Sequence, residues 1–499
     1  MCGIIGFVGK NQINKIFRAN YESIKNRGVF FHSQIHSNEA YGYIRLPTDA
    51  VKNTELNTIG ENKDRLLYNG LLTNISDLNR IFSLKSAARH SDTVTLHCGF
   101  KQYGKYFLEQ CRGMFAFAYV NKNTITLARD TIGIKPLYYI YDKELFGFCS
   151  EIKGLLNCNN AKIYELLPGE ILSYNRKLHQ IRKDSFIYKP LKHAETDIQK
   201  CLEESLVPSA KRYLQQSEKN IALLISGGLD SSIILQILYN NLSKTYRKRI
   251  ITFCTGNTHS SDILIAKRLT NLLGFQLVKV PPYTSAQANL ILSKMVYKAE
   301  SCFSRVIRVA LLQDALAKSI QKMNINVVLS GEGADELFFG YPRFIDGMLP
   351  NEIRDSFHLF FKTVFPSTLL QRYDRVFAQK QIEGRVPFLD QELVVLAQQY
   401  KTSELIGIFE GKQFSKIPLR QLAKSIGLPP YIYLRKKTTM TRGATNKDNH
   451  EDGQFQCLVN QYYKEQFNNN RINSDIKTRA DETTIISNKK HLNHNMLHH

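Results

Sequence analysis

Two apolar runs in the second half of the chain each end in a glycine-rich turn that leads into a helix-like segment. Ile221–Ile225 is followed by Ser-Gly-Gly-Leu-Asp-Ser-Ser at 226–232, and Val327–Leu329 by Ser-Gly-Glu-Gly-Ala-Asp-Glu at 330–336. Short apolar runs before a glycine turn are typical of buried strands. Because such strands alternate here with helical stretches, the sequence predicts a doubly wound parallel sheet with both turns at the carboxyl ends of strands.

The first half of the chain has a different pattern of predicted secondary structure. Residues 1–185 contain mainly short strands, and polar turns such as Asn121–Asn123 separate several of them. This pattern is typical of hairpins and antiparallel sheets. Since 499 residues exceed what one core holds, we expect one domain at 1–185, a linker at 186–200 and a second domain at 201–464. The polar segment 465–499 is expected to be disordered.

Composition narrows the class of protein. Nine scattered cysteines without a C-x-x-C pair favour reduced thiols in a cytoplasmic or cytosol-like compartment. We find no secretory signal and no apolar stretch long enough to cross a membrane. The net charge of +23 allows a nucleic acid or an anionic substrate. Nucleic acid is the weaker expectation, because the basic residues are spread along the chain without a dense run.

The two glycine turns have the chemistry of a nucleotide site. Gly227 and Gly228 let the backbone approach a phosphate, and the start of the following helix adds N–H donors. Asp230 and Asp335 supply carboxylates for Mg²⁺, while Ser330 and Gly331 can hold adenosine or ribose. The first turn resembles the pyrophosphate-binding loop of synthetases that cleave ATP to AMP and pyrophosphate. The alternatives are a plain strand-to-helix turn and a solvated acidic turn.

Cys2 follows the initiator methionine directly. A small second residue normally permits removal of Met1, which would leave a terminal cysteine with both a thiol and a free α-amine. The amine has an ordinary pKa of about 7.7–8.0, so it can accept the thiol proton near neutral pH and activate the nucleophile. The alternative is an accidental cysteine before the apolar strand Ile4–Val8.

Together these motifs resemble those of the glutamine-hydrolysing asparagine synthetases, from Met1 to about Lys437. In the first half the matching segments are Met1–Ile4, Asn26–Gly28, Arg45-Leu46, Tyr68–Gly70, Ser91-Asp92, Gly113–Ala118, Arg129-Asp130, Gly133–Tyr138 and Ser150–Lys153. In the second half they are the two glycine turns and Glu383–Asp390.

The resemblance implies a fold and a set of roles. The first domain would be an αββα sandwich of the N-terminal-nucleophile hydrolase type, and the second an α/β domain like the adenine-nucleotide α-hydrolases. Cys2 would attack the glutamine amide, and Asn69 with the Gly70 N–H would form the oxyanion hole. Arg45, Leu46 and Asp92 would bind the rest of glutamine. Ammonia would then travel inside the protein to an acyl-adenylate made from ATP.

In the second domain the resemblance assigns nucleotide contacts and substrate contacts. Glu332 would assist adenylate formation and attack by ammonia, and Asp230 with Asp335 would bind Mg²⁺. The nucleotide would contact Ile225, Ser226, Gly227, Gly228, Asp230, Ser231, Thr255, Ser330 and Gly331. Basic residues expected near the acid substrate or pyrophosphate are Arg308, Lys416, Arg420 and Lys437. Taken singly, Arg45 also fits a surface residue, Asn69 a turn residue, Asp92 a helix N-cap, and the four basic residues a solvated face.

The chain departs from the family at both substrate pockets. Leu71 replaces a glutamate that helps to bind glutamine, Arg305-Val306 replaces a Thr-Thr pair, and Phe339 replaces a glycine of a Phe-Gly-Gly-Tyr segment. Val29-Phe30 and Pro47-Thr48 also differ from the usual residues. These changes leave the acid that receives nitrogen, and the strength of the glutaminase, as open points.

The leading hypothesis is synthesis of asparagine, AMP, pyrophosphate and glutamate from aspartate, ATP and glutamine, with Mg²⁺ and with a homodimer as one assembly. A second hypothesis applies the same chemistry to another carboxylic acid. A third, from a different class, is a degenerate binding or regulatory protein. The intact glycine turns favour the first two.

Overall fold

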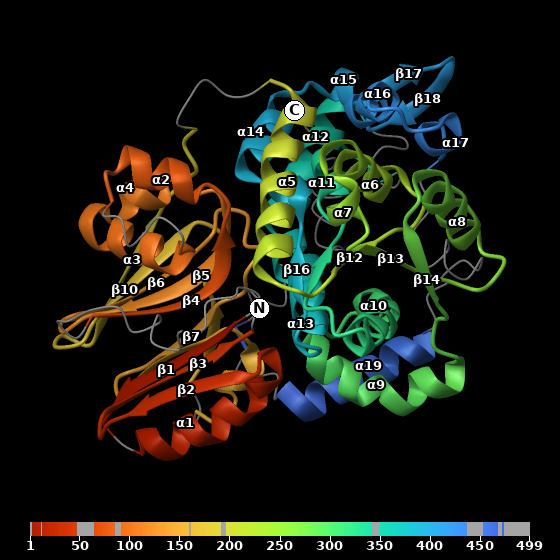
Figure 1. The fold of residues 1–499 in the computed structure, drawn as a ribbon. Coiled ribbons are helices and arrows are strands. Elements are labelled where there is room, and N and C mark those ends of the chain that lie inside the picture. The colour runs from red at the N-terminus through yellow and green to blue at the C-terminus, as the bar shows by residue number, and fades with distance from the viewer. Residues whose placement is uncertain are drawn as a thin grey trace, which may run out of the picture.

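The computed structural model describes residues 2–10, 12–46, 64–84, 91–158, 161–190, 196–341, 349–436, 453–467 and 472–473. Figure 1 shows two halves side by side, with the N-terminal strands in red to yellow on one side and the later helices and strands in green to blue on the other. The N-terminus lies between the two halves.

The first half contains two antiparallel sheets that pack face to face. The strand order of the first sheet is β2 (Phe30–Ile35), β3 (Glu39–Arg45), β1 (Gly3–Gly9), β8 (Leu145–Cys149), β7 (Tyr138–Tyr141), β9 (Ile163–Glu165). The second sheet runs β11 (Gln180–Ser185), β10 (Glu170–Asn175), β6 (Thr124–Arg129), β5 (Gly113–Val120), β4 (Arg65–Leu72). The helical elements of this half are α1 (Ile13–Tyr21), η1 (Glu22–Arg27), α2 (Ile75–Ile81), α3 (Asp92–Tyr103), α4 (Lys105–Leu108) and η3 (Ile152–Leu155).

Alternation along β1 explains the layers. Ile4 and Val8 point toward the second sheet, where they pack in a core with Leu67 and Ala118. Ile5 and Phe7 point the other way and pack with residues of α1. The outer face of the second sheet is covered by α2, α3 and α4 in the same manner. Because successive side chains of a strand lie on opposite faces, one strand serves both cores, and the predicted αββα sandwich is confirmed.

The second half is built on a parallel sheet, as predicted. Its order is β14 (Gln276–Val280), β13 (Ile250–Thr255), β12 (Ile221–Leu224), β15 (Val327–Leu329), β16 (Glu383–Arg385), and all neighbouring pairs are parallel. Figure 1 shows helices on both sides of this sheet. Since β12, β13 and β15 are neighbours, the turns that follow them meet at one edge.

The remaining elements of the second half are mostly helices. They are α5 (Ile198–Gln216), α6 (Leu229–Asn241), α7 (Lys244–Arg247), α8 (Ser261–Leu273), α9 (Ser285–Ala299), α10 (Ser304–Lys322), α11 (Ala334–Leu337), α12 (Pro350–Lys362), the π-helix η5 (Phe365–Leu369), α13 (Leu370–Ala378), η6 (Pro387–Leu389), α14 (Gln391–Gln399), α15 (Thr402–Leu405), α16 (Ile417–Ser425), α17 (Pro430–Tyr433) and α19 (Gly453–Phe467), with the hairpin β17 (Ile406–Phe409) and β18 (Lys412–Ser415).

The beginning of the expected disordered tail belongs to the fold. Helix α19 continues to Phe467, which is fully buried, and Ile472 is buried and pairs with Ile163 of β9. Disorder was expected from residue 465 because the segment is polar. These two apolar side chains are nonetheless enough to anchor its first residues, and the rest of the tail lies outside the described residues.

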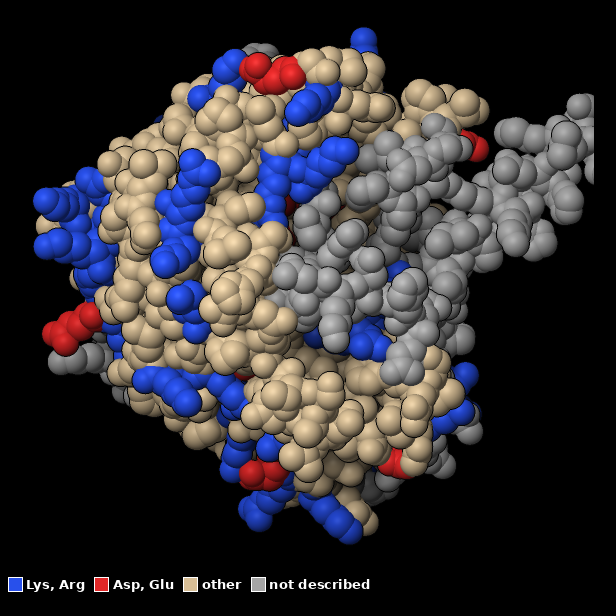
Figure 2. Space-filling view, turned by 90° about the vertical axis from the view of Figure 1, so that its right-hand side faces the viewer, with Lys and Arg blue, Asp and Glu red and all other residues tan. Residues whose placement is uncertain are grey.

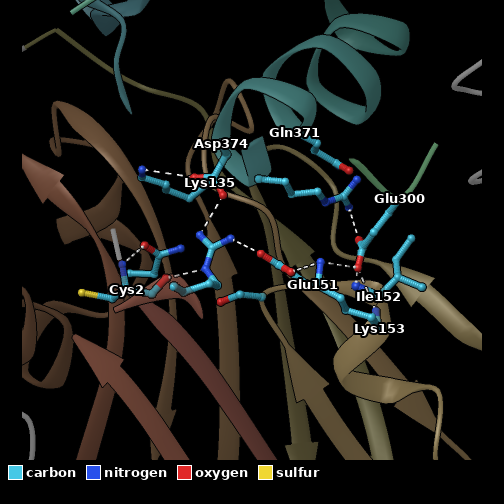
Figure 3. Close-up of polar contacts among 12 residues, drawn as sticks. Cys2, Lys135, Glu151, Ile152, Lys153, Glu300, Gln371 and Asp374 are labelled. Atoms are coloured by element: carbon cyan, nitrogen blue, oxygen red, sulfur yellow. Dashed lines mark hydrogen bonds and ion pairs between the residues drawn. The ribbon is translucent and has the colours of Figure 1, made fainter. Parts of the chain in front are cut away.

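A buried layer of charged side chains joins the two halves (Figure 3). Arg27 pairs with Glu151 and, at 2.7 Å, with Asp374 of α13. Glu300, at the end of α9, accepts from the Ile152 N–H at 3.0 Å and pairs with Arg375 at 2.7 Å. Desolvated ions of this kind are tolerated only when each is paired. The two halves can therefore pack stably only in the arrangement that brings each of these charged side chains to its partner.

Candidate active sites

The first candidate site is built around Cys2, which precedes β1. Its backbone N–H donates to Asn69 Oδ1 at 3.1 Å, and its carbonyl accepts from Arg27 Nε at 2.9 Å (Figure 3). The Cys2 side chain is partly exposed, whereas Asn69 and Arg27 are fully buried. The cysteine is thus held by its backbone while its thiol is left accessible.

Asn69 has the properties expected of an oxyanion-hole residue. Its Nδ2 is buried and has no hydrogen-bond acceptor within the described part of the chain. A buried donor without a partner costs about 1–3 kcal/mol, and a developing oxyanion would satisfy it. A Cβ on the neighbouring Gly70 would lie 2.3 Å from the Met114 carbonyl oxygen. Glycine is therefore required where β4 and β5 pass each other beside Asn69.

Arg45, the last residue of β3, lies beside this site. The β1–β3 register pairs Gly3 with Ile44, which places Arg45 next to Cys2. No described carboxylate pairs with the Arg45 guanidinium, and Leu46 is buried. A cation in this position suits a substrate carboxylate.

Asp92 is the first residue of α3, but Ser91 is the N-cap and accepts from the Val94 N–H at 3.3 Å. The interpretation of Asp92 as the cap itself is therefore wrong. Asp92 Oδ2 accepts from Tyr68 OH at 3.2 Å, and burial, with the charge of Asp92, raises the pKa of Tyr68 well above its usual value. Tyr68 and Asn69 are successive residues of β4, so their side chains lie on opposite faces of this strand, and the contact with Tyr68 does not by itself place Asp92 beside Cys2.

The second candidate site is a cavity of about 270 Å³ at the carboxyl edge of the parallel sheet. It is lined by both glycine turns, by Thr255 at the end of β13 and by basic residues of later elements. Thr255 Oγ1 is buried and has no hydrogen-bond partner among the described residues. The lining residues that sequence motifs predicted as nucleotide contacts are Ile225, Ser226, Gly228, Asp230, Ser231, Thr255, Ser330 and Gly331.

Gly227 shapes this cavity without lining it. Its φ is +64°, and a Cβ there would lie 2.7 Å from the Ile265 side chain and 2.9 Å from the Ala266 nitrogen. Only glycine readily adopts this positive φ and also leaves room for the Ile265 side chain and the Ala266 nitrogen. The turn consequently brings Gly228 to the start of α6, where free N–H groups can meet a phosphate.

Lys416 joins the two predicted metal ligands. Its Nζ lies 2.7 Å from Asp230 Oδ1 and 2.6 Å from Asp335 Oδ1. The two carboxylates thus converge on one point, as a shared Mg²⁺ would need. No group of three or more metal-binding side chains occurs in the described ranges, so phosphate and water oxygens would complete the coordination that Mg²⁺ prefers. On this geometry the residues fit the ion.

The three carboxylates of the second glycine turn have separate partners. Asp335 contacts Lys416, and Glu332 Oε1 accepts from Arg372 at 3.1 Å and from Gln313 at 3.3 Å. Glu336 accepts from Tyr341 OH. Burial, reinforced by the negative charge of Asp335, raises the pKa of Glu336 to about 8. Protein cations and the raised pKa of Glu336 therefore relieve the repulsion among these three neighbouring carboxylates.

The predicted basic residues do not all reach the cavity. Lys416 and Arg420 line it. Arg308 does not, because its guanidinium lies 4.2 Å over the ring of Phe455 in α19. Its position beside a substrate thus has no support from these contacts, and Lys437 lies outside the described residues.

Arg420 is a buried cation at the cavity wall. Its Nε donates to the Ser415 carbonyl at 2.9 Å, and its Nη1 donates to the carbonyls of Tyr433 and Arg435. Burial lowers the pKa of Arg420 to about 10, and the nearby Asp230 only partly opposes this effect. A buried guanidinium bound to carbonyls rather than to a carboxylate favours an anionic ligand.

Four further residues of this site carried no recognised motif. Arg372 and Gln313 hold Glu332, and Arg372 Nε also donates to Gln313 Oε1 at 3.1 Å. Arg435 donates to the Ser226 carbonyl at 3.2 Å and to Asp262 Oδ1 at 2.7 Å. Asp262 lies in the first turn of α8, shortly after the end of β13. A carboxylate just after a strand of the parallel sheet could have been predicted from the sequence as a residue of this site. The other three come from distant helices and loops.

Phe339 adopts a backbone conformation that favours glycine. Its φ is +56°, which explains why a glycine would be expected at this position. Its ring stacks on Phe357 with centroids 4.3 Å apart. The aromatic contact offsets the strained backbone, so this departure changes the packing beside α12.

An apolar cavity of about 40 Å³ lies between the two halves. Leu71 and Met114 line it from the first half, and Leu206, Leu329 and Val386 from the second. Leu71, the residue that replaces the expected glutamate, is buried there. The replacement thus makes the wall of this space apolar.

Glu383, in β16, gives a stability prediction. Its Oε1 accepts from Arg385 Nε at 2.7 Å, and both side chains are buried. Burial raises the pKa of Glu383, but the charge of Arg385, the N-terminal charge, the charge of Lys135 and the hydrogen bond from Arg385 together outweigh burial and lower this pKa to about 2. The ionised carboxylate thus contributes stability above pH ~4.5, the usual pKa in the unfolded chain, and this contribution is lost as the pH falls toward 2.

We expect Glu383→Gln to lower the free energy of unfolding by about 3–5 kcal/mol at pH 7, because Arg385 loses its buried partner. Thermal melts of both proteins between pH 7 and pH 3.5 measure this effect. The difference in melting temperature should shrink below pH ~4.5. A constant difference would contradict the assigned pKa.

The comparisons with known proteins agree with this geometry. Residues 1–202 match the family profile of the glutamine amidotransferase domain, and residues 202–351 and 346–485 match that of asparagine synthase. Asparagine synthetase B of Escherichia coli (strain K12) is 30% identical over 378 residues, covering 71% of this chain and 65% of the relative.

Two other relatives are named glutamine-hydrolyzing asparagine synthetases. The one from Lotus japonicus is 25% identical over 89% of this chain and 78% of its own length. The one from Gallus gallus is 29% identical, but the match covers only 65% of this chain and 63% of the relative. Glutamine phosphoribosylpyrophosphate amidotransferase from B. subtilis overlaps 72% of this chain and 89% of its own with a TM-score of 0.33 at 14% identity.

Proposed function

Because the chain belongs to the asparagine synthase family, we propose that it makes asparagine from aspartate, ATP and glutamine. One observation carries this proposal. Asp230 and Asp335, one from each glycine turn, converge on Lys416 inside a cavity that also contains Glu332 and the Thr255 hydroxyl, which has no hydrogen-bond partner in the described part of the chain. Mg²⁺ held by the two carboxylates, together with Lys416 and Arg420 in the same cavity, would neutralise a pyrophosphate leaving group while a carboxylate attacks the α-phosphate.

The Cys2 site would release the nitrogen. With Met1 removed, the Cys2 thiolate attacks the glutamine amide carbon, and the Asn69 Nδ2–H stabilises the resulting oxyanion. The freed α-amine of Cys2, which took the thiol proton, returns that proton to the leaving nitrogen, so that collapse of the intermediate expels ammonia and leaves a thioester, which water hydrolyses to glutamate. Arg45 would bind the α-carboxylate of glutamine and Asp92 its ammonium group. Leu71 contributes no charge to this binding, so we expect weaker affinity for glutamine.

The second site would consume the nitrogen. The aspartate β-carboxylate attacks the α-phosphorus of ATP, which forms a β-aspartyl-adenylate and releases pyrophosphate. Mg²⁺ held by Asp230 and Asp335 would supply charge neutralisation to the phosphates. Ammonia then attacks the acyl carbon, and loss of one proton and of AMP gives asparagine. Glu332, positioned by Arg372 and Gln313, would accept that proton.

The apolar cavity beside Leu71 offers a path for ammonia between the sites. Its walls come from both halves and are mostly apolar, with Asp390, Ser205 and Ser209 among the few polar residues that line it. We expect Leu71→Trp to fill this space at a stability cost of about 1–3 kcal/mol. The variant should release glutamate but form less asparagine per glutamate than the parent protein.

Amino-acid analysis of both products measures this ratio. Synthesis from added ammonium provides the matched control, because ammonium can enter the second site without passing Leu71. An unchanged ratio would mean that ammonia follows another route.

A product assay tests the proposal as a whole. Purified protein is incubated with ATP, Mg²⁺ and aspartate, and with either glutamine or ammonium; AMP, pyrophosphate and amino acids are then measured. Asparagine from both nitrogen sources supports the proposal. Pyrophosphate only with a different carboxylic acid would show another acceptor, and absence of ATP cleavage with every acid would overturn enzymatic function.

A further inference from the structure

One face of the second half carries exposed cations, and the elements that form it expose no carboxylate. We define the cationic face as the outer surface of α8, β14, α9 and the last turns of α10. Residues 243–326, which include these elements, contain thirteen Lys and Arg but only three Asp and Glu. All three acids, Asp262, Glu300 and Asp314, are buried. This stretch therefore has no exposed carboxylate.

The three buried acids are already used inside the fold. Asp262 pairs with Arg435 at 2.7 Å, and Glu300 with Arg375 at 2.7 Å. Asp314 contacts Lys298 at 3.0 Å and Lys318 at 3.3 Å, and accepts from Tyr283 OH at 2.7 Å. The cations at the surface are consequently not neutralised from below.

Figure 2 shows this face toward the viewer, with Lys and Arg spread across it and Asp and Glu at only a few places. Its exposed cations are Lys267, Arg268, Lys279, Lys294 and Lys322. Overall composition does not explain the bias, because residues 349–411 of the same chain contain seven Lys and Arg and eight Asp and Glu. The adjacent helix α19 adds one charge of each sign, Lys464 and Glu465.

The charge is densest where α9 and α10 pack together. Lys294 and Lys298 lie one turn apart on α9, and Lys318 and Lys322 lie one turn apart on α10. Lys380, after α13, lies close enough for burial together with the charges of Lys298, Lys318 and Lys294 to lower its pKa. Asp314 is the single carboxylate within this group of five lysines. The surplus positive charge is available to an anion from outside.

We propose that the cationic face binds the phosphate backbone of a nucleic acid. Its cations come from four separate elements, a spread that suits a polymer with regularly spaced phosphates better than a small anion. An anionic membrane is less favoured, because the exposed apolar side chains of this face are few and are divided among α8 (Leu264, Leu272), α9 (Leu290) and the end of α10 (Met323). Nucleic acid was the weaker expectation from the sequence because the chain has no dense run of basic residues. In the folded protein, basic residues that are distant in the sequence lie on one face.

The inference is independent of the proposed enzymatic function. The five exposed cations line neither the nucleotide cavity nor the space between the halves. Charge reversal there should leave asparagine synthesis unchanged. Bound nucleic acid would therefore act on the location or assembly of the protein rather than on its chemistry.

The test compares the parent protein with a variant that carries Lys267→Glu, Arg268→Glu, Lys279→Glu, Lys294→Glu and Lys322→Glu. Fluorescence anisotropy measures binding of a labelled single-stranded oligouridylate of about 20 nucleotides at several salt concentrations. For the parent we expect log K to fall with log salt by about 0.7 for each phosphate neutralised. The variant should bind at least about tenfold more weakly, with a shallower slope.

A second variant provides the matched control for net charge. Lys15→Glu, Arg18→Glu, Lys122→Glu, Lys143→Glu and Lys177→Glu reverse five exposed cations of the first half. This control should retain binding; an equal loss in both variants would overturn the proposal. Failure of the parent to bind the oligonucleotide at 100 mM salt, or binding only to vesicles rich in phosphatidylserine, would overturn it as well. If the reversed variant melts at a lower temperature, the corresponding five glutamine substitutions replace it.

Discussion

Replacement of Cys2 by alanine should abolish glutamine-dependent asparagine synthesis and leave ammonium-dependent synthesis intact. The thiol is the only nucleophile that the proposed mechanism uses at the first site, so its loss should reduce glutamine hydrolysis by about 10⁴-fold or more. The backbone contacts of Cys2 to Asn69 and Arg27 do not involve the side chain. Alanine should therefore preserve the surrounding fold.

Parallel assays of glutamate release and of asparagine formation from each nitrogen source measure this effect. Cys98→Ala is a suitable control, because that cysteine is also partly exposed but lies on α3. Loss of synthesis from both nitrogen sources in Cys2→Ala would contradict the division into two sites. Full retention of glutaminase would remove Cys2 from the mechanism.

The Asp230→Asn variant should show the opposite pattern. It should lose asparagine formation from glutamine and from ammonium alike, by about 10²–10³-fold, since one of the two carboxylates that converge on Lys416 no longer carries charge. Glutamine hydrolysis at Cys2 should continue, because Asp230 belongs to the other half of the chain. Asparagine retains the size of the side chain and one acceptor for Lys416.

Pyrophosphate release at several Mg²⁺ concentrations measures the loss. Glu410→Gln is the control, since Glu410 pairs with Lys424 at the surface. If higher Mg²⁺ restores the rate of Asp230→Asn, the residue binds the ion. A rate equal to that of the parent protein would exclude Asp230 from the reaction.

The sequence predicted those parts of the fold in which local pattern and burial coincide. The strands before both glycine turns are completely flanked by other strands, so they appear as apolar runs. Strands β2 and β11 were not predicted from the sequence. Each is an edge strand of its sheet and exposes most of its side chains. A half-exposed edge strand has no apolar run to mark it.

The candidate sites were predictable to the extent that glycine turns and short motifs define them. Asp230, Asp335 and Lys416 were each named from the sequence, and Asp230 and Asp335 were expected to share one ion, but the ion pairs that both make with Lys416 were not foreseen. Arg372 and Gln313 were missed because their role exists only after α10 and α13 pack beside Glu332. Arg308 was expected near the substrate because of its place in a short motif, but its guanidinium lies over the ring of Phe455. That contact could not be predicted from the motif.

The pairing of Ile472 with Ile163 has a consequence for handling the protein. The polypeptide passes between the halves twice: once at the segment before α5, and again when the chain returns from α19 to β9. A protease cut near residue 193 would leave two fragments that still co-migrate on a sizing column. If the amino-terminal sandwich were expressed alone, β9 would lose its pairing with Ile472 and its outer edge would be exposed.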